Sequence, residues 1–267
     1  MSSASLYGEI PSGVTSPIQS LNEEQRAKLE QFKEIVASWP EDLIEDKAQA
    51  DEMAMYRYLL GLQWQLDVAS NHLKETLEWR KTFRPQDLRA KDFESVAKQG
   101  WCYHYGFDRQ SRPIIFLKMG RDTAPDTEEN RLLKYKYLAY VQEKCISRMP
   151  PGVYNITWVV DLHQANVTLA MCQNMKDMFV KLGDHYTERL ARVYVMNLGW
   201  GLSMIWSFIK PFLAKSTVEK YNIIKGNDKH IAEEIAKGLD PAQTPKEFFG
   251  QVDYNFDIQK IIDEESK

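Results

Sequence analysis

The chain has 267 residues, of which 43% are hydrophobic and 27% charged, a balance typical of one large folded domain with a smaller attachment and not of a disordered chain. Its net charge of -4 provides no bulk basic field for nucleic-acid binding, so any membrane contact must be local and largely apolar. The three cysteines have no zinc-type spacing and no apolar leader precedes Arg26, the first basic residue, so we expect a reduced, cytoplasmic setting.

The first ninety residues predict an arm followed by a helical unit. Residues 1–20 are rich in Ser, Gly and Pro, which favours a flexible arm. Ser20 and Glu23 have the spacing of a capping box, which predicts that a helix begins there. Three helices are expected within residues 21–90: from the capping box to about Ser38, Asp51–Leu62 and Asp67–Thr82.

Residues 91–255 alternate between strand and helix patterns. Strands are predicted at Trp101–Tyr105, Pro113–Leu117, Ile156–Leu162, Val193–Asn197 and Tyr221–Ile224. Helices are predicted at Glu128–Arg148, Ala170–Leu182 and Lys229–Lys237. This alternation predicts a mixed α/β sheet with mostly parallel pairing and helices around it. The first two strands form a hairpin in this prediction, and residues 256–267 are expected to be a C-terminal tail with a peripheral helix.

The segment from Trp200 to Phe212 is too apolar for a surface helix. Its apolar residues fall on nearly every side of a helical wheel, so such a helix is buried or faces something other than water. Lys210 and Pro211 interrupt it, which leaves it too short to span a bilayer. Two interpretations stay open, a core helix and a movable wall over an apolar pocket. The candidate wall residues are Trp200, Met204, Ile205, Phe208, Ile209 and Phe212.

A set of spaced motifs covers most of the chain. The set comprises LKETLEWRKTF, DRQSRPI, WVVDL, HYTERL, VYVMN, IKPFL, STVEK and TPKEFFG. In this order the chain resembles the CRAL-TRIO lipid-binding family, in particular its phosphatidylinositol transfer branch. The resemblance implies a helical N-terminal unit packed on an α/β domain whose sheet floors a lipid cavity, with the apolar segment at Trp200–Phe212 as its gate.

The resemblance also implies a headgroup site. The family's inositol-binding positions map onto Asp108, Pro113, Glu188, Thr217 and Lys220. Carboxylates, a hydroxyl and an ammonium suit an inositol phosphate, which offers hydroxyls and an anionic phosphate. Taken alone, Glu188 and Lys220 also fit solvated surface charges and Thr217 fits a helix-start hydroxyl, so both interpretations stay open.

Two departures from the branch bear on the ligand. Leu60-Gly61-Leu62-Gln63 stands where the branch carries a basic run, so another cation must hold the phosphate. Ile156 and Trp158 replace hydroxyl residues, and His104 a tyrosine, at positions that resemble the family's phosphatidylcholine contacts. These replacements argue against phosphatidylcholine, and a bulky Trp158 in the cavity favours a different second ligand such as a sterol.

The sequence therefore predicts a monomeric lipid-binding and lipid-exchange protein that moves a single phospholipid, phosphatidylinositol by resemblance, between membranes, without a cofactor, a metal or nucleic acid. One alternative is a regulatory module that presents lipid to, or binds, a kinase or small GTPase. A second is a carrier of a sterol, haem or another hydrophobe. An enzyme is not expected, because only Asp161 and His163 near a strand end motivate one, and no nucleophile or cofactor motif accompanies them. Asp161 itself is expected to be a strand-end residue bonded to neighbouring amides.

Overall fold

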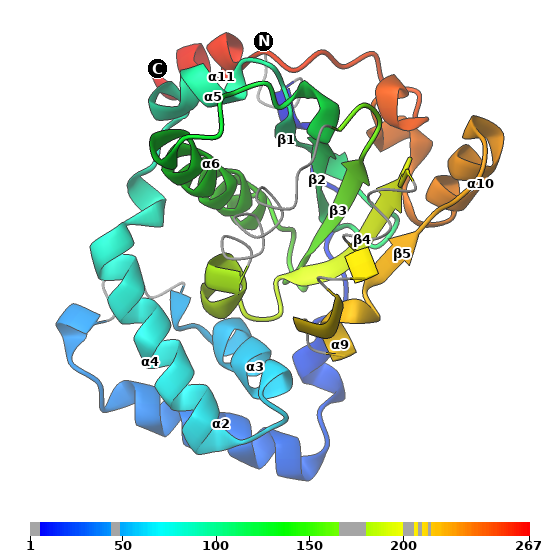
Figure 1. The fold of residues 1–267 in the computed structure, drawn as a ribbon. Helices are drawn as coiled ribbons and strands as arrows, with labels where there is room; N and C mark the ends of the chain where they lie inside the picture. Colours follow the sequence, from blue (N-terminus) through cyan, green and yellow to red (C-terminus); the bar gives the residue numbers. More distant parts are fainter. Residues whose placement is uncertain (1–5, 44–48, 166–179, 200–205, 208–209, 213–214) are drawn as a thin grey trace.

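The computed structural model describes residues 6–43, 49–165, 180–199, 206–207, 210–212 and 215–267. Its helical unit contains α2 (Glu23–Ala37), α3 (Glu52–Gly61) and α4 (Leu66–Phe83), which pack on one another around a small core (Figure 1). Phe32 of α2, Leu59 of α3 and Leu73 of α4 are all buried there. The three predicted helices are thus present, because each carries an apolar stripe at helical spacing.

The N-cap of the first helix lies two residues after the predicted one. Asn22 is the N-cap, since its side chain accepts from the Gln25 amide at 2.8 Å while the Gln25 side chain accepts from the Asn22 amide at 3.2 Å. The capping box predicted from Ser20 is therefore wrong. The reason is local: Pro17–Ser20 forms its own 3-10 turn, in which the Ser20 hydroxyl donates to the Pro17 carbonyl at 2.9 Å.

Within the described residues, five strands form one sheet in the order β1-β2-β3-β4-β5. They are β1 (Cys102–Phe107), β2 (Pro113–Lys118), β3 (Ile156–Asp161), β4 (Leu190–Met196) and β5 (Tyr221–Ile223). The β1–β2 hairpin is antiparallel, and the other three pairings are parallel. This confirms the predicted mixed, mostly parallel α/β fold.

Two layers of side chains cover the sheet. One face, which we call the α6 face, packs against α6 (Glu128–Ser147) and includes Trp158 and Val193. The opposite face packs against α10 (Asp228–Gly238) and includes Val159 and Tyr194. Because successive strand residues point to opposite faces, the register places one row of side chains across the α6 face. That row is His104, Ile115, Trp158, Val193 and Tyr221.

The remaining elements are short. They include α5 (Glu94–Ala97), α9 (Lys215–Val218) and α11 (Ile258–Glu265), and residues 180–185 are also helical. The 3-10 turns after the first are Glu41–Leu43, Pro85–Asp87, Ala90–Phe93, Met119–Arg121, Lys210–Phe212, Pro241–Gln243 and Lys246–Phe248. Most of the predicted Ala170–Leu182 helix lies outside the described residues.

The N-terminal segment lies against the sheet unit. Leu6 and Tyr7 are buried in the core on the α6 face, and the Val14 amide donates to the Pro151 carbonyl at 2.9 Å. The sequence predicts a flexible arm at residues 1–20, and the structure shows these contacts within that range. At the other end, Ile258 and Ile261 of α11 are buried in the same core.

His104 is expected to make the stability pH-dependent. Burial lowers the pKa of its imidazole from an ordinary 6.5 to about 4. The unfolded chain therefore takes up this proton near pH 6.5 and the folded chain only near pH 4. The contribution of His104 to the free energy of unfolding is fully present above pH 6.5. About 3 kcal/mol of it is lost as the pH falls from 6.5 to 4.

Urea denaturation at a series of pH values tests this expectation. His104→Asn keeps a donor for the Ile114 carbonyl, which His104 Nδ1 contacts at 3.0 Å, but does not titrate. Its free energy of unfolding should depend less on pH between 7 and 4 than that of the wild type. Equal pH dependence in the two proteins would contradict the assignment.

Candidate functional site

An ion pair marks the edge of the sheet where the parallel strands begin. Glu188 lies two residues before β4 and Lys220 directly before β5, so the two side chains meet at neighbouring strand ends. Lys220 Nζ donates to Glu188 Oε2 at 2.9 Å, and about a fifth of each side chain is exposed (20% and 21%). The Lys220 amide donates to the Thr217 carbonyl at 3.1 Å, which holds α9 beside the pair. Three of the five predicted headgroup residues thus lie together.

Helix α3 holds the backbone at Glu188. Glu188 has a φ of 54°, in the left-handed region, and Arg57 Nη1 donates to the carbonyl of the preceding Thr187 at 2.6 Å. Gly61 lies directly against this turn, because a Cβ there would be 2.8 Å from Thr187 Cγ2 and 3.2 Å from Glu188 Cγ. The uncharged Leu60-Gly61-Leu62-Gln63 run therefore provides close packing against Glu188.

Two buried arginines add positive charge next to this edge. Arg57 and Arg189 are 4% and 9% exposed, and burial lowers the pKa of both guanidinium groups. Arg57 Nη1 donates to the carbonyl of Thr187 at 2.6 Å, and Arg189 Nη1 donates to the carbonyl of Tyr154 at 2.9 Å. Among the described residues neither has a carboxylate oxygen within 4 Å, although the charges of Asp51 and Glu188 act on Arg57 and those of Asp51 and Glu143 on Arg189.

Both carboxylate oxygens of Asp108 accept hydrogen bonds at the hairpin turn. Its Oδ1 accepts from the amides of Gln110 at 2.8 Å and Arg112 at 2.9 Å, and its Oδ2 accepts from the Thr157 hydroxyl at 2.7 Å. Pro113 begins β2 and pairs with Phe107. Both residues lie at the same end of the sheet as the Glu188–Lys220 pair but at β1 and β2, on the other side of β3. The structure therefore does not place them in contact with the pair.

The α6 face carries the predicted pocket residues that can be located. Ile156 and Trp158 are buried there, 0% and 8% exposed. Helix α6 packs on β1 and β2, whereas Val160 of β3 and Tyr221 and Ile223 of β5 are only half-buried on the same face. The apolar face is therefore less covered by described residues at β3–β5 than under α6.

The apolar segment after β4 approaches that part of the face. The Trp206 ring lies 4.7 Å from the Tyr221 ring, centroid to centroid. Trp200, Met204, Ile205, Phe208 and Ile209, which were predicted to form the gate, lie outside the described residues. For Phe212 only the backbone is described, in the 3-10 turn Lys210–Phe212.

Asp161 and His163 lie at the C-terminal end of β3. Asp161 Oδ1 accepts from the His163 amide at 2.9 Å and from Asn197 Nδ2 at 2.8 Å, which confirms the strand-end interpretation. In the part of the chain that the structure describes, no three His, Cys, Asp or Glu side chains come together as metal ligands would.

Sequence reasoning missed the arginines at this edge. Arg57 contacts a residue 130 positions away, and no local pattern reports such a pairing. One signal was available: Arg57 is the only charge in the apolar run Met53–Leu62, where a buried charge demands polar partners.

Comparisons with known proteins agree with this architecture. The CRAL/TRIO domain model matches residues 97–250. A CRAL-TRIO domain-containing protein of Schizosaccharomyces pombe is 25% identical over 224 residues, which cover 82% of this chain and 22% of that protein. The phosphatidylinositol transfer protein PDR17 of Saccharomyces cerevisiae is 26% identical over 288 residues, covering 94% of this chain and 76% of PDR17.

Two further comparisons concern a cytosolic factor and a solved structure. The SEC14 cytosolic factor of Kluyveromyces lactis is 25% identical over 258 residues, covering 90% of this chain and 83% of the factor. The crystal structure of Sfh5 superimposes with a TM-score of 0.68 at 15% identity, covering 90% of this chain and 91% of that one, which shows a shared fold. Within the described ranges, no helix combines the length and the apolar character that a membrane span needs.

Proposed function

Because the chain belongs to the CRAL/TRIO domain family, we propose that it binds a single phospholipid over the α6 face of its sheet and moves it between membranes. Phosphatidylinositol is the proposed ligand. The observation that carries the proposal is the position of Trp206: an apolar segment reaches an incompletely covered apolar sheet face at Tyr221, next to the Glu188–Lys220 pair. The name of PDR17, a phosphatidylinositol transfer protein, supports the transfer role, and the name of the SEC14 cytosolic factor supports a cytoplasmic location.

The cost of exposing acyl chains to water argues for a gate. Each buried CH₂ contributes about 0.8 kcal/mol, so a diacyl lipid with ~30 chain carbons would cost on the order of 24 kcal/mol to move through water. Exchange therefore requires the open protein to rest transiently on a bilayer. In this proposal the segment at 200–212 covers the acyl chains in the closed protein and contacts lipid in the open one.

The headgroup is proposed to sit at the Glu188–Lys220 edge. Glu188 accepts from inositol hydroxyls, Lys220 and the Thr217 hydroxyl donate to ligand oxygens, and the positive potential of Arg57 and Arg189 favours the phosphate. Asp108 and Pro113 shape the neighbouring hairpin turn in this arrangement. The two arginines thereby serve in place of the basic run that Leu60-Gly61-Leu62-Gln63 lacks.

Two measurements test the function. Mass spectrometry of an organic extract of the purified protein should identify a phospholipid, with phosphatidylinositol prominent. Transfer of labelled lipid between vesicles should be faster for phosphatidylinositol than for phosphatidylcholine. Absence of both bound lipid and transfer would refute the proposal. Bound lipid without transfer would favour a regulatory module that presents lipid to a kinase or small GTPase.

Trp158 supports a second candidate ligand class. Its large side chain is buried in the middle of the α6 face, where it takes up space on the floor of the proposed cavity. A compact hydrophobe such as a sterol needs less length than two acyl chains. A sterol as the main extracted species would replace the phospholipid assignment while leaving the carrier role.

A further inference from the structure

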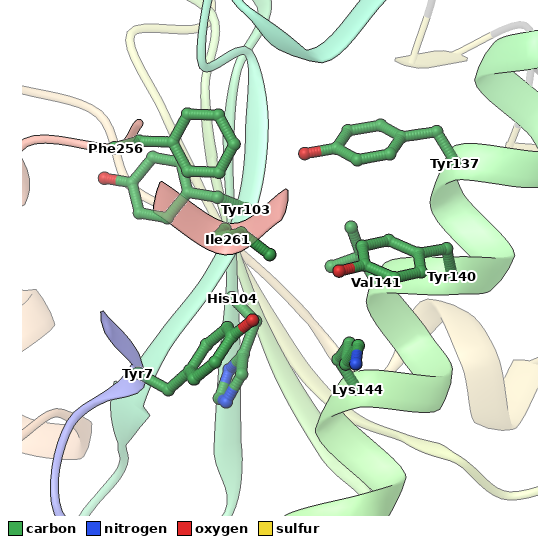
Figure 2. Close-up of a pocket in the computed structure, with 9 residues that line it drawn as sticks. All are labelled: Tyr7, Tyr103, His104, Tyr137, Tyr140, Val141, Lys144, Phe256 and Ile261. Carbon is green, nitrogen blue, oxygen red and sulfur yellow. The ribbon is translucent and has the colours of Figure 1, made fainter. Parts of the chain in front are cut away.

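A small cavity lies where β1, α6 and both ends of the described chain meet (Figure 2). Its volume is about 10 Å³, close to the minimum that holds one water molecule. Tyr7 of the N-terminal segment, Tyr140 of α6 and Ile261 of α11 line it, together with His104 of β1. Most of its walls are aromatic or aliphatic, so its few polar atoms decide what it can bind.

The His104 ring has a defined tautomer. Its Nδ1 lies 3.0 Å from the Ile114 carbonyl oxygen, which can only accept, so Nδ1 carries the proton. Burial lowers the pKa of the ring, which is therefore neutral at pH 7 with a single proton. Its Nε2 consequently presents a lone pair and acts as a hydrogen-bond acceptor.

That acceptor has no partner among the described residues. His104 is 4% exposed and its Nε2 is buried without a hydrogen bond. The ring cannot easily turn, since Tyr7 stacks on it at 5.8 Å with an interplanar angle of 15° and Phe107 meets it edge-on at 6.2 Å. An acceptor fixed in this way needs a donor that comes from outside the described chain.

The charges around the cavity select a neutral molecule. The Lys144 ammonium lines it and Arg148 is close, so a cation is repelled. The carboxylate of Glu265, which accepts from the Tyr140 hydroxyl at 2.9 Å, and the lone pair of His104 oppose an anion. A neutral oxygen that carries at least one proton satisfies the orphaned lone pair of His104.

We propose that this place is a binding site for one neutral O–H group of the size of a water molecule, which donates to His104 Nε2. The volume favours water over the hydroxyl of a larger lipophilic molecule. This inference is independent of the proposed transfer function.

Nitrogen NMR of the full-length protein labelled at histidine tests the proposal at pH 7. The His104 signals are identified by their loss in His104→Asn. We expect a proton on Nδ1, an Nε2 resonance shifted in the direction of an accepted hydrogen bond, and magnetisation transfer from water to the ring proton Hε1. A protonated Nε2, or an unbonded Nε2 without contact to water, would overturn the proposal.

One comparison completes the test. Spectra before and after organic extraction distinguish the sources. Unchanged water contact supports bound water, whereas loss of the Nε2 shift on extraction supports the hydroxyl of a lipophilic ligand in the same site.

Discussion

We expect the free energy of unfolding of the Glu143→Ala variant to be about 3–5 kcal/mol lower than that of the wild type. Glu143 of α6 accepts from Arg80 Nη1 at 2.8 Å and Nη2 at 3.0 Å and from the Tyr186 hydroxyl at 2.7 Å. Arg80 belongs to α4 and is 6% exposed. The substitution takes the bidentate carboxylate away from this buried guanidinium and removes the ion pair that links α4 to α6.

Chemical denaturation followed by circular dichroism measures this loss, and the chain offers a matched control. Lys81, the next residue along α4, pairs with Asp42 at 2.8 Å, but these side chains are 31% and 78% exposed. Asp42→Ala should therefore cost less than about 1 kcal/mol. A Glu143→Ala variant as stable as Asp42→Ala would show that the buried pair contributes little.

Exchanging the two charges at the sheet edge is expected to abolish most phosphatidylinositol transfer. In the double variant Glu188→Lys, Lys220→Glu the ion pair can re-form, so a purely structural role would be preserved. The groups that face the ligand, however, are reversed. Losing one charge-assisted hydrogen bond of about 1.5–3 kcal/mol lowers affinity roughly 10- to 100-fold, and transfer should fall accordingly.

Vesicle transfer and thermal unfolding, measured on the same preparations, separate binding from folding. The melting temperature should stay close to that of the wild type. The equivalent exchange of Glu24 and Lys28, paired at 2.9 Å on α2, serves as the control and should leave transfer unchanged. Wild-type transfer by the Glu188–Lys220 exchange would remove these residues from the headgroup site.

The sheet was predictable because its strands are buried on both faces. Ile156–Asp161 and Pro113–Lys118 are short, nearly continuous apolar runs. This pattern is typical of strands that are covered on both faces. The start of β4 was not predictable. The strand begins at Leu190, three residues before the predicted Val193; Leu190–Arg192 is its less buried end, and the charged Arg192 interrupts the apolar run there.

The site was predictable only in part. The resemblance implies Glu188, Thr217 and Lys220 as headgroup residues, and the structure places these three next to one another. Asp108 carried a competing signal, since an Asp before Gln110 and Arg112-Pro113 is typical of a turn whose carboxylate binds following amides. Contacts such as that of Arg57 with Thr187 depend on how α3 docks on the sheet unit, and pairing over 130 positions leaves no periodicity to detect.

Because Tyr7 packs on the sheet unit, the helical unit is inserted in the sequence between two parts of that unit. Leu6–Gly8 packs on the sheet unit, α2, α3 and α4 follow, and the described strands come after them. A shortened chain that starts at residue 91 would lose this wall and uncover the His104 ring. The two units cannot be dissected by a single cut without damaging the second of them.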